Sequence, residues 1–100
     1  MALMQIAVIP MATQSTSLSR YIAALQEELQ KSGAIYQLTD MGTIVEGDAT
    51  HLLQLAARLH ELPFAMGLKR VITTIQLDDR RDKGTSLGDK TQSVEKILAE

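Results

Sequence analysis

One short run near the start of the chain restricts the fold more than any other feature. The segment Leu3–Ile9 contains β-branched residues and ends at Pro10, which is typical of a strand. Apart from Gln5, both of its alternating sets of side chains are apolar: Met4, Ile6 and Val8 on one face, and Leu3, Ala7 and Ile9 on the other. A strand of this kind is buried on both sides. In a chain of 100 residues, the chain's own helices can cover one side of this strand. We therefore expect the other side to contact a second subunit.

Composition narrows the class of protein. Hydrophobic residues make up 45% and charged residues 22% of the chain, close to the average of globular domains, and this excludes a largely disordered chain. The length predicts a single domain over residues 1–100. A formal charge of −2 leaves no excess of positive charge for a row of phosphates, so we expect no nucleic-acid partner. Because there is no cysteine, disulfides and thiolate metal sites are impossible.

The N-terminal stretch, residues 1–11, is apolar but contains no lysine or arginine, and Pro10 interrupts it. It is too short for a membrane span and lacks the charged start of a targeting segment. We therefore expect no membrane partner and a cytoplasmic location.

The first amphipathic helix is expected after a polar loop. Thr16 or Ser17 can serve as its N-cap, and Gly33 suits a left-handed position at its end. Between them, five apolar residues repeat at i, i+3, i+4, i+7 and i+11: Leu18, Tyr21, Ile22, Leu25 and Leu29.

Two further helices follow. Asp48 is a good N-cap for the second, and Gly67 is a plausible stop. The last helix runs from about Leu87 or Asp89 to the C-terminus. We expect three of its apolar residues to face inward: Val94, Ile97 and Leu98.

The remaining segments predict three more strands. Ile35–Leu38 and Ile44–Gly47 can form a hairpin, and Arg70–Leu77 alternates two faces over its whole length. The order β-α-β-β-α-β plus a C-terminal helix predicts a ferredoxin-like α+β sandwich, an antiparallel sheet with both crossover helices on one face. The opposite face stays bare, with Ile72 beside one apolar set of the first strand. Such a patch indicates a homo-oligomer, either a homodimer or a homotetramer.

Catalytic and metal sites find little support. His51 and His60 are nine residues apart on one helix and point to opposite sides, so we expect no metal site. No serine lies in a strand–turn–helix elbow, and we expect no catalytic residue. The charged run Asp78–Lys83 is typical of a self-paired surface loop, the alternative being that Arg80 or Asp82 reaches a neighbouring subunit.

Two side chains are candidates for ligand contacts. Tyr36 either fills the core or stacks on a flat heterocycle. Glu46, in an otherwise apolar strand, either forms a strand-end salt bridge or anchors a cationic or amino-bearing ligand. Phe64 is expected to fill the core, and His60 to be partly buried and bonded to backbone or to a carboxylate.

Several pieces of the sequence, in order and at their spacings, carry a resemblance to a known family. They are Pro10 with the Ser/Thr-rich loop to Ser17, Ser32-Gly33 and Tyr36, Met41-Gly42-Thr43 with Glu46-Gly47, His60-Glu61 with Pro63-Phe64 and Gly67, Arg70-Val71 with Thr73, and the run Asp78–Lys83. With these pieces the chain resembles the thiamine-binding protein family over nearly its whole length. The resemblance implies a ferredoxin-like homo-oligomer without established catalysis, with thiamine or its pyrimidine part as a small-molecule ligand and no other cofactor.

A thiamine pocket needs a stacking surface, polar groups for the pyrimidine edge and a carboxylate near the cation. Tyr36, Thr43 and Glu46 supply these chemical types within one hairpin, next to Gly42. The residues expected to frame the pocket are Thr16, Ser17, His60 and Arg70. Two alternatives remain: a small ferredoxin-like enzyme that uses Glu46 or His60 as general base, and an interaction module whose bare sheet face binds a partner.

Overall fold

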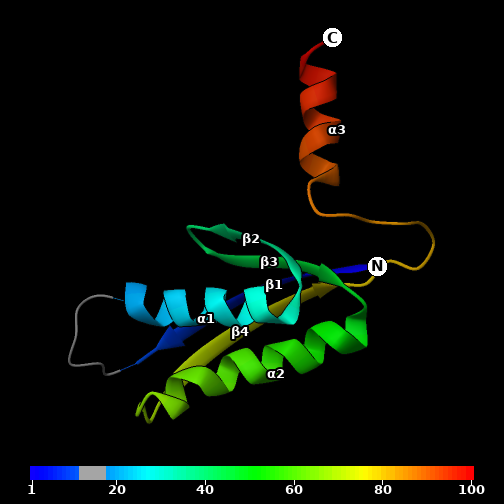
Figure 1. The fold of residues 1–100 in the computed structure, drawn as a ribbon. Helices are drawn as coiled ribbons and strands as arrows, with labels where there is room; N and C mark the ends of the chain where they lie inside the picture. The colour runs from blue at the N-terminus through cyan, green and yellow to red at the C-terminus, as the bar shows by residue number, and fades with distance from the viewer. Residues whose placement is uncertain (12–17) are drawn as a thin grey trace.

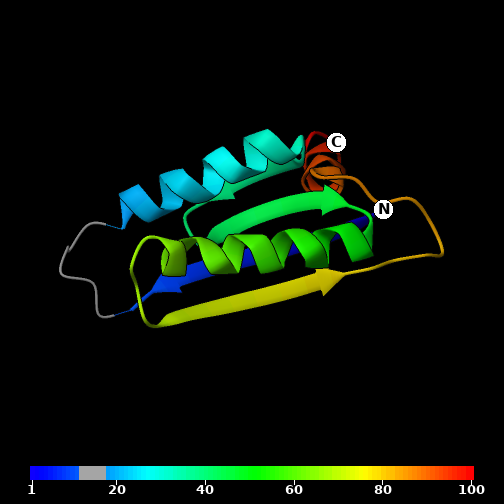
Figure 2. The ribbon, with the colours of Figure 1, turned by 60° about the horizontal axis from the view of Figure 1, so that its bottom comes forward.

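The computed structural model describes residues 1–11 and 18–100 and contains four strands and three helices in these residues (Figure 1). In chain order they are β1 (Ala2–Pro10), α1 (Ser19–Ser32), β2 (Ile35–Thr39), β3 (Gly42–Gly47), α2 (Ala49–Ala65), β4 (Val71–Asp78) and α3 (Asp89–Leu98). The strands form one antiparallel sheet in the order β2-β3-β1-β4. Figure 2 shows α1 and α2 together on one face of this sheet. The predicted ferredoxin-like α+β sandwich with an extra C-terminal helix is confirmed.

The core lies between the sheet and these two helices. Met4, Ile6 and Val8 of β1 point into it, as the alternation in the sequence predicts, and Val45 of β3 lies beside them. The apolar stripes of the helices close the core from the other side, with Leu25 and Leu29 from α1 and Leu52, Leu55, Ala56 and Leu59 from α2. Each fully buried side chain of this size contributes about 1.5–3 kcal/mol to the free energy of unfolding.

No helix or strand among the described residues covers the other face of the sheet. The register pairs Ile9 with Ile72 and places Ala7 opposite Thr74, so that these side chains share this face. Ile9 and Ile72 are 42% and 43% exposed. We call this surface the open face; its residues are Leu3, Gln5, Ala7 and Ile9 of β1, Ile72, Thr74 and Gln76 of β4, Ile44 and Glu46 of β3, and Ile35 and Gln37 of β2.

The ends of the helices agree only in part with expectation. Gly33 follows α1 in the left-handed conformation, with φ of 72°, as predicted. The N-cap of α1 is Leu18, which forms no side-chain cap hydrogen bond. The two predicted caps, Thr16 and Ser17, lie outside the described residues. Asp48 occupies the N-cap of α2 as predicted, but its side chain forms no cap hydrogen bond.

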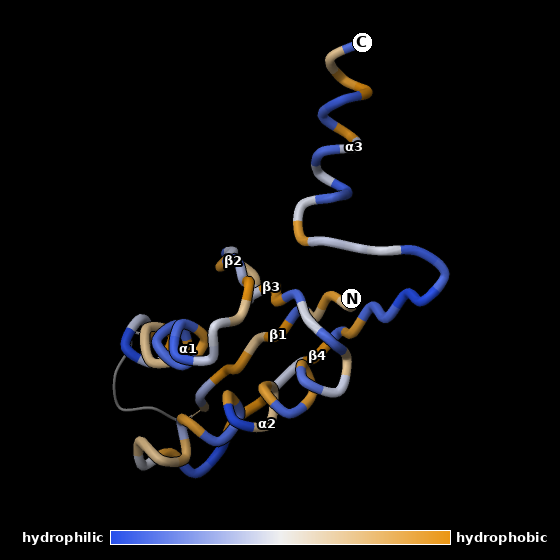
Figure 3. The backbone as a smooth tube through the Cα atoms, turned by 45° about the vertical axis from the view of Figure 1, so that its right-hand side comes forward, coloured by the Kyte–Doolittle hydropathy of each residue, from blue (hydrophilic) through white to orange (hydrophobic). Residues whose placement is uncertain are grey.

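The position of α3 contradicts one expectation. This helix buries no residue, and Val94, Ile97 and Leu98 are 55%, 65% and 78% exposed rather than inward-facing. Figure 3 shows its apolar segments standing away from the sheet. The radius of gyration is 15.1 Å, whereas a compact domain of this length has a radius of gyration of about 13 Å. The inward prediction was wrong because an amphipathic stripe shows that a helix needs a partner surface without showing which surface that is.

Among the described residues, no helix is long and apolar enough to cross a membrane.

The β2–β3 hairpin closes at a glycine that no other residue replaces easily. Gly42 has a φ of 151°, and a Cβ on it would lie 2.8 Å from the carbonyl oxygen of Ile6 on the neighbouring strand. This distance is shorter than any real Cβ contact, and the obstacle is backbone. The side chain of residue 42 is therefore excluded by the close approach of the hairpin to β1.

Replacing this glycine is expected to destabilise the protein. We expect Gly42→Ala to lower the free energy of unfolding by about 1–3 kcal/mol, because the new methyl group forces β1 and the hairpin apart. Urea unfolding followed by circular dichroism measures the loss. Gly84→Ala is the matched control, since a Cβ there meets nothing within 4 Å. Equal stability of the two variants would contradict the close approach.

Candidate functional site

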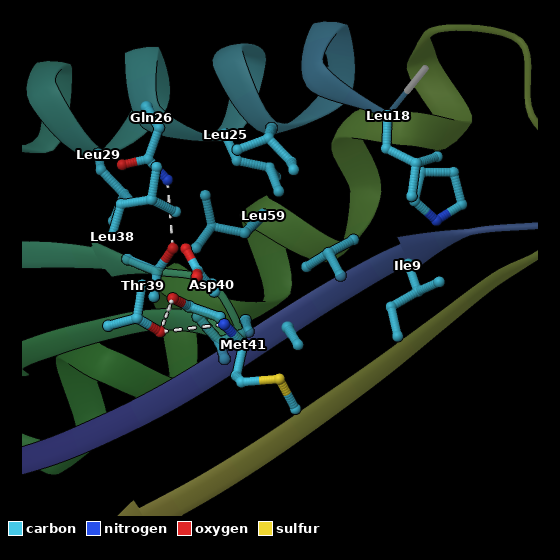
Figure 4. Close-up of a pocket in the computed structure, with 17 residues that line it drawn as sticks. Ile9, Leu18, Leu25, Gln26, Leu29, Leu38, Thr39, Asp40, Met41 and Leu59 are labelled. Carbon is cyan, nitrogen blue, oxygen red and sulfur yellow. Dashed lines mark hydrogen bonds between the residues drawn. The ribbon is translucent and has the colours of Figure 1, made fainter. Parts of the chain in front are cut away.

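A cavity of about 290 Å³ lies between α1 and the sheet, at the end where β1 passes the β2–β3 hairpin (Figure 4). This volume is just below the range of ordinary ligand pockets, which begins at about 300 Å³. Its walls are residues 6–10 of β1, Leu18, Ile22, Leu25, Gln26 and Leu29 from α1 and its N-cap, residues 38–43 of the hairpin, and Leu59 of α2. Most of these side chains are aliphatic, so the cavity suits a small and partly apolar ligand.

Polar groups lie on the hairpin side of the cavity. The side-chain amide of Gln26 on α1 donates a hydrogen bond to Thr43 Oγ1 on β3, at 3.2 Å. A hydroxyl that accepts one hydrogen bond still has its own proton to donate. Thr43 is the only buried polar side chain in the described residues, and Asp40 adds an exposed carboxylate at the turn. Together these groups offer a donor and an acceptor at the wall and a negative charge at the mouth.

The hairpin turn is held in place by its own hydrogen bonds. Thr39 Oγ1 donates to the carbonyl oxygen of Gly42 at 2.8 Å and accepts from the amide N–H of Met41 at 3.3 Å (Figure 4). Two bonds on one hydroxyl fix the turn that presents Asp40. The polar side of the cavity is therefore preformed, which reduces the ordering cost of binding.

The backbone of β1 also contributes to the cavity. β1 pairs with β3 only as far as Ile6 but with β4 as far as Pro10. In the described part of the chain, the edge of β1 beyond Ile6 thus has no neighbouring strand on the hairpin side. The N–H of Met11 donates to the carbonyl oxygen of Arg70, which shows that its backbone groups point toward β4. Because these groups alternate along a strand, those of Val8 point to the free edge, which lines the cavity.

The structure does not bring the two most prominent sequence candidates together. Tyr36 pairs with Val45 and packs on the helix-covered side, against the core. Glu46 pairs with Ile35 and lies on the open face. Its Oε1 accepts a hydrogen bond from the backbone N–H of Leu87 at 3.0 Å. This bond is neither of the two roles expected for Glu46; it holds the segment that leads into α3.

The other sequence candidates are scattered. Of the expected ligand contacts, Gly42 and Thr43 line the cavity, whereas His60 and Arg70 are not among its lining residues. His60 Nδ1 lies 2.6 Å from Thr73 Oγ1, and its ring meets Phe64 edge-on at a centroid distance of 5.4 Å. Its partner is thus a hydroxyl rather than the backbone or carboxylate that we expected. The last two, Thr16 and Ser17, lie outside the described residues.

The charged run after β4 pairs with itself, as its composition predicts. Arg80 contacts Asp82 at 2.6 Å and Arg81 contacts Asp79 at 2.7 Å. The hydrogen bond from Arg81 lowers the pKa of Asp79, and the hydrogen bond from Arg80 lowers the pKa of Asp82. Exposed pairs of this kind contribute little to stability. Outside residues 12–17, no group of three or more metal-ligating side chains is close enough to hold a metal ion.

The chain matches the family model of the thiamine-binding proteins over residues 4–95. The chain belongs to the thiamine-binding protein family. It is 46% identical to a UPF0045 protein of Staphylococcus xylosus, with 98% of this chain and 95% of the relative covered. It is 45% identical to UPF0045 protein YqgV of Bacillus subtilis, with 98% of both chains covered.

Solved structures of lower identity share the fold of this family member. The crystal structure of a hypothetical protein of Methanocaldococcus jannaschii matches with a TM-score of 0.82 at 23% identity, covering 94% of this chain and 95% of the other. A protein of Thermotoga maritima, described as a candidate thiamine biosynthesis or salvage protein, matches with a TM-score of 0.77 at 20% identity, covering 93% and 97%.

Sequence reasoning missed several residues of the cavity. Gln26 and Asp40 were not among the expected ligand contacts, because a polar residue on a helix and an aspartate at a turn are common outside binding sites. Both positions become recognisable only once α1 is placed over the hairpin. A weak signal existed for Asp40, because it precedes the Met41-Gly42-Thr43 piece that the family resemblance singles out.

The contact between His60 and Thr73 predicts a structural role for this histidine. We expect Thr73→Val to lower the free energy of unfolding by about 1 kcal/mol, because a partly buried ring nitrogen loses its hydrogen-bond partner. Urea unfolding measures the change. Thr74→Val, the neighbouring substitution on the open face, makes the same chemical change without touching His60. If both variants are as stable as the parent protein, the contact between His60 and Thr73 does not contribute to the free energy of unfolding.

Proposed function

We propose that this protein is a non-catalytic small-molecule binding protein that holds thiamine or a related pyrimidine in the cavity between α1 and the β2–β3 hairpin. The observation that carries the proposal is the preformed cavity itself, which is mostly aliphatic and polar at one end. Pockets of this kind bind by shape and by a few well-placed polar contacts. We further propose a cytoplasmic location, since a chain without cysteine has no disulfide to gain in an oxidising compartment.

The chemistry of the cavity suits the two parts of thiamine. An aminopyrimidine ring presents acceptor nitrogens and a donor amine on one edge, which Thr43, Gln26 and the free backbone edge at Val8 can match. The thiazolium ring is a permanent cation and requires no hydrogen bond, only a nearby negative charge. Asp40 at the exposed turn provides such a charge, so that we place the pyrimidine inside and the thiazolium at the mouth.

Two comparisons support this ligand class. The chain belongs to the thiamine-binding protein family. A structural neighbour from Thermotoga maritima, described as a candidate for thiamine biosynthesis or salvage, shares its fold. The enzyme alternative has less support, because Glu46 and His60, its two candidate bases, are absent from the cavity lining and are each hydrogen-bonded elsewhere.

The proposed site lies next to a proposed subunit interface. Ala7 and Ile9 belong to the open face, and both also line the cavity, because the cavity reaches the free edge of β1. A second copy stacked on the open face, as a homodimer or within a homotetramer, would approach the mouth of the cavity. The proposal therefore retains a ligand site near an interface, with the ligand on the helix-covered side of the sheet.

Removing the charge at the mouth tests the proposed orientation. We expect isothermal titration calorimetry to detect thiamine binding, and Asp40→Asn to weaken it by about 2- to 5-fold, the effect of one exposed ion pair. The neutral ligand 4-amino-5-hydroxymethyl-2-methylpyrimidine should bind both proteins equally, because it lacks the cation. Asp48→Asn is the matched control, with the same change of charge at an exposed residue outside the cavity.

A companion variant tests the inner end of the cavity. Thr43→Val retains the shape of the side chain but removes its hydroxyl, so it should weaken thiamine and the neutral pyrimidine alike. The absence of heat with either ligand would refute the proposed function. If neither Asp40→Asn nor Thr43→Val changes the affinity for thiamine, the proposed site is wrong, although the proposed ligand is not.

A further inference from the structure

Helix α3 is too short to be stable alone. It has ten residues, and isolated helices below about 12–15 residues are marginal in water. Its apolar residues Val94, Ile97 and Leu98 form one stripe at i, i+3 and i+4. The body of the chain does not bury this stripe, since α3 contains no buried residue. A surface outside the described chain is needed to cover it.

The start of α3 is fixed beside the open face. Glu46, which lies on that face, accepts a hydrogen bond from the N–H of Leu87 at 3.0 Å. The carboxylate of Asp89 accepts from the N–H of Ser86 at 2.8 Å, and the N–H of Asp89 donates back to the Ser86 carbonyl. Figures 1 and 2 show that α3 then projects from the side of the sheet opposite α1 and α2. The helix thus begins at the end of the open face, next to Glu46, and does not turn back onto that face.

The open face is of limited extent. Its strands have 9, 5, 6 and 8 residues. At about 3.3 Å per residue and 4.8 Å between strands, they give a flat area of about 440 Å². A standard interface buries about 800 Å² of accessible surface on each partner. A flat area leaves out the relief of the side chains, so the accessible surface of this face is larger than about 440 Å², and burial of the α3 stripe against the same partner would add to it.

We propose that α3 is a clasp that packs its apolar stripe against the side of a second copy of this chain, stacked on the open face. Sheets stack about 10 Å apart, and ten helical residues span about 15 Å, so α3 is long enough to pass the plane of the partner's sheet. A two-fold axis supplies two such contacts, one from each copy. One chain thus carries two exposed apolar surfaces, the open face and the stripe of α3, and a second copy would cover both.

This inference rests on the homo-oligomer within the proposed function, and the test separates the two. Sedimentation equilibrium compares the parent protein with Ile97→Ser and with Gln92→Ser, which introduces the same residue on the opposite side of α3. We expect the parent protein to associate and Ile97→Ser to raise its dissociation constant roughly 10- to 100-fold, because the lost burial counts twice in a two-fold assembly. Gln92→Ser should leave it unchanged.

Each of the other outcomes contradicts a specific part of the proposal. A monomeric parent protein would overturn the assembly and the clasp together, without bearing on thiamine binding by the cavity. An associating parent protein that is indifferent to Ile97→Ser would overturn the clasp alone. Equal weakening by both serine variants would mean that helix propensity, and not the apolar stripe, is responsible, and would also overturn the clasp. Far-UV circular dichroism of each variant verifies that the body remains folded, as expected for a helix that buries no residue.

Discussion

The two-sided apolar character of β1 is the constraint on which the rest of the structure depends. One side of this strand supplies Met4, Ile6 and Val8 to the core, and the two crossover helices cover it. Residues 1–11 and 18–100 form no third layer on the other side, and the last helix stands away from the sheet instead of covering it. A strand of this kind loses part of its hydrophobic stabilisation unless a second surface covers the open face. The proposed assembly would therefore complete the packing that folding leaves unfinished on this strand.

The cavity arises from the same strand. β1 is longer than the hairpin beside it, and where the hairpin ends, the strand, α1 and the turn enclose a space that none of the described side chains fills. Gly42 permits the close approach that seals one wall, and the Gln26–Thr43 hydrogen bond connects the helix to the sheet across another. A mismatch in strand length thus provides the cavity in which we propose that the ligand binds.

The sequence predicted the fold well because its signals are local and repeated. Period-two alternation identified the core side of β1, helical spacing identified the stripes of α1 and α2, and the order of elements left one common topology. The site was harder. Tyr36 and Glu46 share a hairpin, but the register pairs Glu46 with Ile35, and a shift of one residue moves a side chain to the opposite face. Turn length sets that register, and it cannot be read from composition to within one residue.

The most direct test of a ligand site on the covered side of the sheet is a methyl NMR titration with thiamine. The chain has eight isoleucines, of which Ile6, Ile9 and Ile22 line the cavity. The account predicts that thiamine shifts the methyl signals of Ile6 and Ile22 and leaves Ile35, on the far edge of the open face, unchanged. Shifts at Ile35 with none at Ile6 and Ile22 would contradict the account and place the ligand on the other side of the sheet.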